Sequence, residues 1–142
     1  MPKHRKTKII LDTNWYISAS INRNSRRKIF DLLTQKDINV YYSKELLQEY
    51  MNTISRDKFK KIITPSQVKR FTNFVLLQCT KISIKTLVEK SRDIKDNYLL
   101  SMSMDGKIDF LITGDEDLLV LKEFGKTKIL TFREFLELIP RY

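Results

Sequence analysis

Short apolar runs of strand-forming residues alternate along this chain with stretches whose apolar residues recur at helical spacing. The runs with strand character cover residues 8–11, 38–42, 81–84, 110–113 and 128–130. Strands that alternate with helices typically form a parallel sheet covered by those helices. The sequence therefore predicts an α/β fold with a central, largely parallel sheet.

Several helix starts can be recognised from capping residues. Ser43 precedes apolar positions at helical spacing, and Thr64-Pro65-Ser66-Gln67 and Thr131-Phe132-Arg133-Glu134 have the pattern of a capping box. A helical pattern also follows Ser25, and another helix is expected to begin within residues 93–96 and to stop at Gly106. The expected helices thus fall between the expected strands.

Length and composition limit the kind of protein this is. The chain has 142 residues, of which 42% are hydrophobic, and we expect one domain over residues 1–142 with residues 1–7 as a basic N-terminal tail. Cys79 and His4 are the only residues of their types, which excludes an internal disulfide and makes soft-metal or histidine-based chemistry implausible. No apolar run approaches the roughly 18 residues of a membrane span, so we expect a cytoplasmic protein.

The positive charge is concentrated in one half of the chain. The net charge is +10, and residues 1–70 contain sixteen Lys and Arg against six Asp and Glu, whereas residues 71–142 contain eleven of each. Such an excess favours a polyanionic partner such as RNA, with an acidic protein as the competing interpretation. The residues expected to bind nucleic acid form two clusters: Arg26, Arg27 and Lys28, and Lys58, Lys60 and Lys61.

Two of the expected strands run into carboxylates. Asp12 follows residues 8–11 directly, and Asp115 follows residues 110–113 after one glycine. The carboxyl ends of parallel strands meet at one edge of a sheet, where open α/β sheets bind their ligands. We therefore expect the Asp12 and Asp115 side chains to point into one crevice.

Four further carboxylates occupy positions near that crevice. Glu49 lies at the edge of the apolar face of the helix after Ser43, Asp96 lies near a helix start, and Asp93 and Asp117 are close in sequence to Asp96 and Asp115. Each acid also has a simpler interpretation: a turn residue for Asp12 and Asp115, a helix cap for Asp96, a solvated carboxylate for Glu49. Asp93 and Asp117 are more simply caps or supporting groups than direct ligands.

Clustered carboxylates have a specific chemistry. Without basic neighbours they repel one another, and this repulsion raises the pKa of at least one member. Mg²⁺ and Mn²⁺ prefer oxygen ligands and offset the repulsion. In nucleases such ions activate a water and stabilise the attacking and leaving oxygens, and no histidine is required.

The order of these acids along the chain resembles the PIN-domain nuclease family. The first motif is Ile10-Leu11-Asp12-Thr13-Asn14, the second ends in Gln48-Glu49-Tyr50, and the third contains Asp93-Ile94-Lys95-Asp96. The fourth is Thr113-Gly114-Asp115-Glu116-Asp117. The match extends over about residues 8–138. Within the family, the pattern is most similar to that of bacterial toxins from toxin–antitoxin systems, which resemble virulence-associated protein C.

The resemblance implies a three-layer α/β/α fold and Mg²⁺- or Mn²⁺-dependent cleavage of single-stranded RNA. It also implies a small antitoxin protein as partner and, in many members, a homodimer. By position, the catalytic and metal-binding acids are Asp12, Glu49, Asp96 and Asp115, with Asp117 as a further metal ligand. Asn14, Thr113 and Asp93 match supporting positions.

Two other functions remain open from the sequence. A PIN-like module could bind nucleic acid without cleaving it, although the full acidic set argues against this. A phospho-acceptor receiver domain also places acids at strand ends, but it normally has paired acids after its first strand, and here Asp12 precedes Thr13. Trp15 is expected to pack near the site, with stacking on a base as the alternative.

Overall fold

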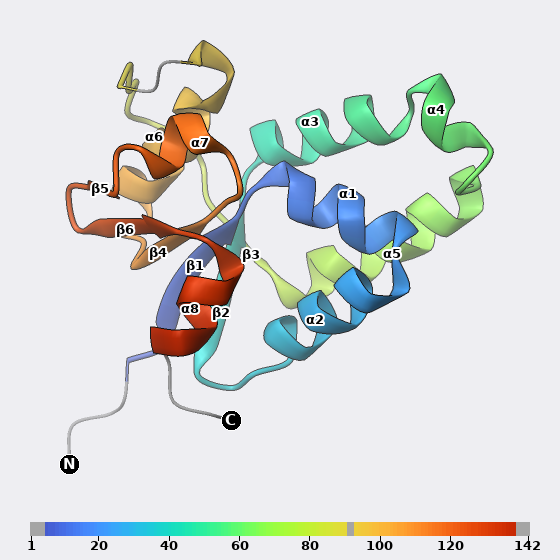
Figure 1. The fold of residues 1–142 in the computed structure, drawn as a ribbon, viewed down its shortest axis with the longest axis horizontal. Coiled ribbons are helices and arrows are strands. Elements are labelled where there is room, and N and C mark those ends of the chain that lie inside the picture. Colours follow the sequence, from blue (N-terminus) through green and yellow to red (C-terminus); the bar gives the residue numbers. More distant parts are fainter. Residues whose placement is uncertain (1–4, 91–92, 139–142) are drawn as a thin grey trace.

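The computed structural model describes residues 5–90 and 93–138 and contains one six-stranded sheet in the order β3-β2-β1-β4-β6-β5 (Figure 1). The strands are β1 (Thr7–Leu11), β2 (Ile38–Tyr42), β3 (Thr80–Lys81), β4 (Phe110–Ile112), β5 (Glu123–Phe124) and β6 (Thr127–Leu130). Neighbouring strands are parallel except β5 and β6, which are antiparallel. The α/β fold with a largely parallel sheet is therefore confirmed.

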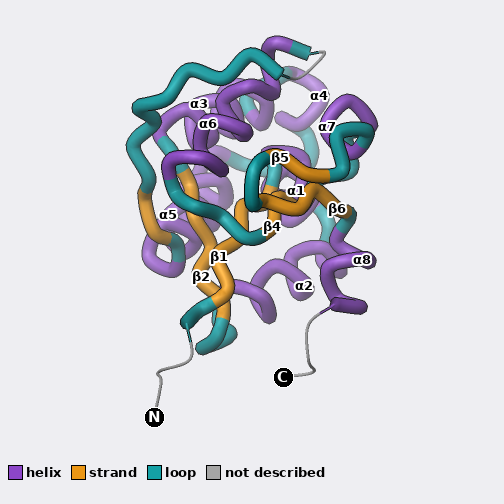
Figure 2. Tube along the Cα trace, turned by 90° about the vertical axis from the view of Figure 1, so that its left-hand side faces the viewer, coloured by secondary structure: helices purple, strands orange, loops and turns teal. Residues whose placement is uncertain are grey.

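Helices lie on both sides of this sheet. They are α1 (Thr13–Ile21), α2 (Arg23–Leu33), α3 (Lys44–Ile54), α4 (Asp57–Lys60), α5 (Pro65–Gln78), α6 (Asn97–Asp105), α7 (Glu116–Leu119) and α8 (Phe132–Leu138), with a 3₁₀ turn, η1, at Ile94–Asp96. Figure 2 shows the strands in the centre, with α5 on one side and α8 on the other. Among the described residues, no helix has both the length and the apolar character needed to cross a bilayer.

The three helix starts expected from capping residues are present. The Ser43 hydroxyl accepts a hydrogen bond from the Leu46 amide, and Thr64 forms a complete capping box with Gln67. The backbone amide of Thr131 donates to the Glu134 carboxylate, while the Glu134 amide donates to the Thr131 hydroxyl. These bonds satisfy backbone donors that the first helical turn leaves unpaired.

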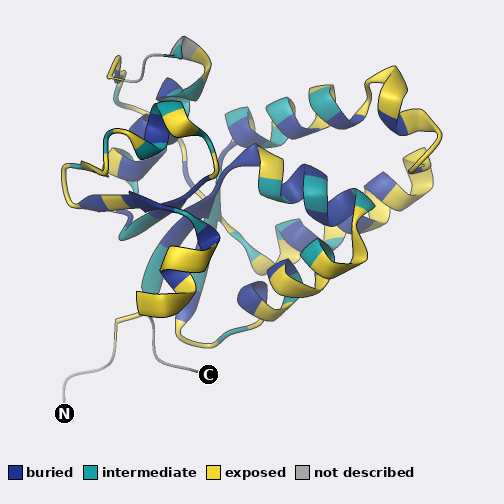
Figure 3. Ribbon diagram, in the orientation of Figure 1, coloured by how far each residue is buried: buried dark blue, intermediate teal, exposed yellow. Residues whose placement is uncertain are grey.

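The strands β1 and β4 form the centre of the core. The β1 residues Ile9, Ile10 and Leu11 and the β4 residues Leu111 and Ile112 have no exposed surface, and Figure 3 shows this buried centre in dark blue. Strands buried on both faces read as continuous apolar runs. The same two strands deliver Asp12 and Asp115, so the candidate site rests on the most buried part of the sheet.

The structure differs from expectation at several elements. The strand expected at residues 81–84 is β3, which covers only Thr80–Lys81. The helices α1, α4 and α7 and the strand β5 were not foreseen. Gly106 does end α6, but its backbone φ is −89°, so left-handed geometry is not the reason for the glycine. A Cβ there would overlap with Ile82 Cδ1 and lie 3.1 Å from the Met102 carbonyl oxygen, so a larger residue would force the Ile82 side chain to shift.

Candidate active site

Asp12 and Asp115 follow adjacent parallel strands. Leu11 of β1 pairs in register with Ile112 of β4, and the Asp12 amide donates to the Ile112 carbonyl at 3.1 Å. The Thr113 hydroxyl donates to Asp12 Oδ2 and accepts a hydrogen bond from the Asp115 amide at 3.0 Å. Thr113 thereby joins the segments that carry the two acids, a role consistent with the supporting position expected for it.

Asp12 is buried at the point where β1 ends and α1 begins. Only 4% of its surface is exposed, and Oδ1 accepts a long hydrogen bond of 3.4 Å from the Trp15 amide. Burial raises the pKa of Asp12, while the hydrogen bonds from Thr113 and from backbone amides act in the opposite direction. The simpler interpretation of Asp12 was a turn residue at a strand end, whereas the structure makes it the cap of α1, with its carboxylate buried.

Asp96 lies at the last position of η1 and differs from an ordinary helix cap. It precedes α6, yet its side chain makes no capping hydrogen bond. Burial is the main cause that raises the pKa of Asp96 to about 8, followed by its hydrogen-bonding contact with Asp115 and by repulsion from Asp115, Asp93 and Glu49. Asp96 Oδ2 is buried without a hydrogen-bond partner among the described residues. Three neighbouring carboxylates are therefore close enough to Asp96 to raise its pKa.

Glu49 reaches this group from α3 and is held by a residue that the sequence analysis did not single out. The Tyr98 hydroxyl donates to Glu49 Oε2 at 2.5 Å and lies 3.0 Å from the Thr13 hydroxyl. Burial and the neighbouring Glu49 raise the pKa of Tyr98, so the phenol stays protonated and acts as a donor. Tyr98 thus connects α1, α3 and α6, and Glu49 is half-buried rather than a solvated helix carboxylate.

The remaining expected residues surround this group. Asp115 caps α7, since its Oδ1 accepts from the Asp117 amide at 2.9 Å, and Asp93 accepts from the Lys95 amide at 3.0 Å. Asn14 is exposed in the first turn of α1. Trp15 is half-buried, with its ring centroid 4.8 Å from that of Phe132, which fits the packing interpretation.

The carboxylate oxygens of the site are suitable ligands for a hard divalent cation, but the acids are not yet close enough together to coordinate one. The acids offer only oxygen ligands, and the unpartnered Asp96 Oδ2 and the raised Asp96 pKa both indicate negative charge that lacks compensation. Within residues 5–90 and 93–138, however, no three His, Cys, Asp or Glu side chains are close enough together to hold a metal ion. Bound cation would therefore have to draw the carboxylates closer.

The basic residues expected to contact nucleic acid do not form one equivalent set. Arg26 donates from Nε to the Ala19 carbonyl at 2.9 Å and from a terminal nitrogen to the Ser20 carbonyl at 3.0 Å. Arg26 therefore caps the carboxyl end of α1, and these hydrogen bonds already occupy donors that could otherwise contact RNA. Arg27 and Lys28 are exposed on α2, and Lys58, Lys60 and Lys61 are exposed in and after α4, with Lys60 paired to Asp57 at 3.0 Å.

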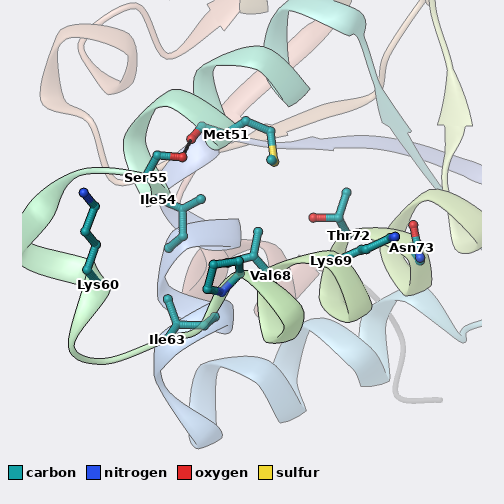
Figure 4. A pocket seen from close by; sticks show the side chains of 10 residues that line it. Met51, Ile54, Ser55, Lys60, Ile63, Val68, Lys69, Thr72 and Asn73 are labelled. Carbon is teal, nitrogen blue, oxygen red and sulfur yellow. Dashed lines mark hydrogen bonds between the residues drawn. The ribbon is translucent and has the colours of Figure 1, made fainter.

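An apolar groove of about 630 Å³ lies apart from the acids, between α3 and α5 (Figure 4). Met51, Ile54, Ile63 and Val68 form much of its wall. None of the candidate site acids lines it, so the groove is not the reaction centre.

Comparisons with known proteins agree with this geometry. The family model of the PIN domain matches residues 8–117. The protein MJ1680 of Methanocaldococcus jannaschii is 30% identical over 148 residues, covering 96% of this chain and 94% of its own. PAE2754 from Pyrobaculum aerophilum has a similar fold, with a TM-score of 0.60 at 12% identity, over 96% of this chain and 97% of that one.

A second solved structure with a similar fold is VapBC2 from Rickettsia felis bound to a DNA fragment from their promoter. Its TM-score is 0.56 at 14% identity, over 87% of this chain and 97% of that chain. The matched family model includes β1, α3, η1, α6 and β4, the elements that carry the acids. This chain belongs to the PIN-domain family.

Proposed function

We propose that the protein is a metal-dependent endoribonuclease that cleaves single-stranded RNA with Asp12, Glu49, Asp96 and Asp115. PIN domains are generally nucleases that use divalent metal ions. The observation that carries the proposal is the gathering of Glu49, Asp96 and Asp115 from three separate motifs, close enough that Asp115 and Glu49 add to the burial that raises the pKa of Asp96 to about 8. Asp12, from the remaining motif, is joined to the Asp115 segment by the Thr113 hydroxyl. Crowded acids of this kind, with no cation to compensate them, are characteristic of catalytic centres.

The residues of the chain would prepare the site for Mg²⁺ or Mn²⁺. When bound, the ion supplies positive charge and lowers the pKa of a water that attacks the phosphodiester. Thr113 and Tyr98 fix Asp12 and Glu49 through their hydrogen bonds before any ligand arrives. Asp96 would retain its proton in the apo protein near neutral pH and release it as cation enters, and Asp117 would be an additional ligand.

We further propose that the protein acts in the cytoplasm as the toxin of a toxin–antitoxin pair. Support comes from the fold shared with VapBC2 of Rickettsia felis, which was crystallised with a promoter fragment. A small antitoxin would be the protein partner, and a homodimer is a further candidate assembly. RNA would be bound by Arg27, Lys28, Lys58, Lys60 and Lys61, with Arg26 contributing less because its donors are engaged.

One observation favours a second candidate, a PIN module that binds nucleic acid without cleaving it. No three acids of the described chain stand at metal-binding distances. If the carboxylates cannot converge on an ion, RNA would bind to the basic surface and remain intact.

Cleavage of a fluorescent single-stranded RNA in millimolar Mn²⁺ distinguishes the two candidates. The native protein should cut, EDTA should stop cleavage, and Asp12→Asn should abolish it while circular dichroism shows the fold retained, because the amide keeps the shape but not the charge. Asp31→Asn, an exposed acid on α2, is the matched control and should cut normally. RNA that stays intact with native protein, yet is bound, would establish the binding module instead.

A further inference from the structure

A second cavity lies at the opposite end of the sheet from the acids, where β1 and β4 begin. It has a volume of about 500 Å³ and is formed by the start of β1, the carboxyl end of α6 and the turn between β5 and β6. Four cationic residues line it: Arg5, Lys8, Lys107 and Lys126. Asp109 is the single acid among its lining residues.

The contacts of these residues show which charges are already compensated. Arg5 donates to Asp109 at 2.7 Å, and the other oxygen of Asp109 accepts from the Lys8 amide at 2.8 Å. The Lys8 ammonium lies 3.4 Å from the Gly106 carbonyl, at the carboxyl end of α6, and 5.8 Å from the centre of the Tyr41 ring. Asp109 and the negative end of α6 are therefore offset by Arg5 and Lys8.

Lys107 and Lys126 remain as uncompensated charges. Both are exposed, and no carboxylate in the part of the chain that the structure describes lies within ion-pair distance of either. Asp105, two residues before Lys107, is engaged elsewhere, because its carboxylate accepts hydrogen bonds from the amides of Lys85 and Thr86. Two lysines on opposite walls thus present positive charge to the same space.

The backbone of Lys107 has an unusual conformation. Its φ is 51°, in the left-handed region that a non-glycine residue rarely adopts, whereas the φ of 57° at Gly125, beside Lys126, is ordinary for a glycine in a tight turn. Residues kept in such conformations cluster at ligand-binding sites, where the surrounding structure maintains them. Phe124, which is half-buried, and Met104, which is 48% exposed, supply apolar surface to the same wall.

We propose that this cavity binds a nucleotide, with its phosphate between Lys107 and Lys126 and its base against Phe124 and Met104. The free donors of the Arg5 guanidinium would add to the phosphate contacts. The volume lies within the range of about 300–1,000 Å³ typical of small-ligand sites, which is sufficient for one nucleotide. The nucleotide is either free or the terminal unit of an RNA strand. The site is separate from the acidic centre and does not depend on the proposed nuclease activity.

The test is a titration of isotope-labelled protein in EDTA, followed by amide chemical shifts. The probes are 5′-AMP, adenosine and a 5′-phosphorylated tetraribonucleotide. AMP should move the amides of Lys107, Gly125, Lys126 and Thr127, and it should bind at least tenfold more tightly than adenosine. Similar binding of the tetranucleotide would identify a strand end as the source, whereas binding of AMP alone would identify the free nucleotide.

Charge reversal supplies the control. Lys107→Glu with Lys126→Glu should abolish the AMP-induced shifts, while Lys44→Glu with Lys69→Glu, two exposed lysines on α3 and α5, should leave them unchanged. The proposal is overturned if AMP leaves the cavity amides unmoved, if adenosine binds equally well, or if both double variants bind AMP like the native protein. A failure of RNA cleavage would not affect these outcomes, since no metal is present.

Discussion

Tyr98 is the residue whose single hydroxyl has the most consequence for the candidate site. Tyr98→Phe removes the hydrogen bonds to Glu49 and Thr13 while keeping the buried ring. A hydrogen bond to a charged group contributes about 1.5–3 kcal/mol, so freeing Glu49 should reduce cleavage by at least about tenfold and weaken Mn²⁺ binding measured by calorimetry. Tyr50→Phe is the matched control, because it loses a buried tyrosine hydrogen bond to Ser20, away from the acids. Equal Mn²⁺ affinity in Tyr98→Phe and native protein would contradict the positioning role.

The raised pKa of Asp96 predicts how the free energy of unfolding of the metal-free protein changes with pH. Its folded-state pKa of about 8 is above the ordinary value of 3.8, so between these values the folded state holds more protons than the unfolded state. The free energy of unfolding in EDTA should therefore fall as the pH rises from 5 to 8. Urea denaturation at four pH values measures this.

Asp96→Asn provides the comparison for that pH series. The amide cannot titrate, so the decline should be shallower in the variant, and the variant should be the more stable protein at pH 8. Parallel curves for the variant and the native protein would show that other groups cause the pH dependence.

At the residue scale, the sequence was informative where chemistry depends on local order. Asp12 and Asp115 could be assigned to one edge of the sheet because each lies within three residues of the end of an apolar strand, and those strands are neighbours. Tyr98 could not be identified, because its partner Glu49 is 49 positions away and no local pattern relates them. The hydrogen bonds from Arg26 to α1 carbonyls could not be predicted from the sequence either, because a cluster of basic residues does not show which of them contacts the protein itself.

At the element scale, helices with local start signals were predicted and helices without them were not. Thr64 and Gln67 are three residues apart, so their capping box can be read directly. The buried positions of α1 are Thr13, Tyr16, Ile17, Ala19 and Ser20, which include polar residues and form no apolar stripe. The short antiparallel strand β5 depends on the positive φ values of Lys122 and Gly125, which only the folded turn determines.

The junction of α1 and α2 supports a prediction about stability. Arg26 closes the end of α1 with two hydrogen bonds to carbonyls, whereas its neighbour Arg27 is exposed. Arg26→Ala should lower the free energy of unfolding by about 1–3 kcal/mol, the usual consequence of leaving carbonyls unpaired. Arg27→Ala should be within about 0.5 kcal/mol of the native protein, as is usual for surface substitutions. Equal stability of the two variants in urea denaturation would show that the Arg26 bonds contribute nothing.

At the scale of the whole molecule, the two ends of the sheet have opposite electrostatic character. Carboxylates gather where β1 and β4 end, and Lys and Arg line the cavity where these strands begin. Parallel strands make this segregation possible, because all the strands except β5 present the same end to the same edge of the sheet. The charge imbalance between the two halves of the sequence indicated a polyanionic partner, but not this second arrangement, to which residues from both halves contribute.

Metal binding should be visible in the stability of the entire protein. A ligand that binds only the folded state stabilises it by about 2.7 kcal/mol at a hundred times its Kd, which corresponds to a rise in Tm of several degrees for a chain of this size. Millimolar Mn²⁺ should therefore raise the Tm of the native protein. Asp115→Asn should have little response to Mn²⁺, yet it should melt no lower than native protein in EDTA, because it relieves the repulsion on Asp96. Asp31→Asn should respond like the native protein, and an equal Tm rise in both variants would place the ion elsewhere.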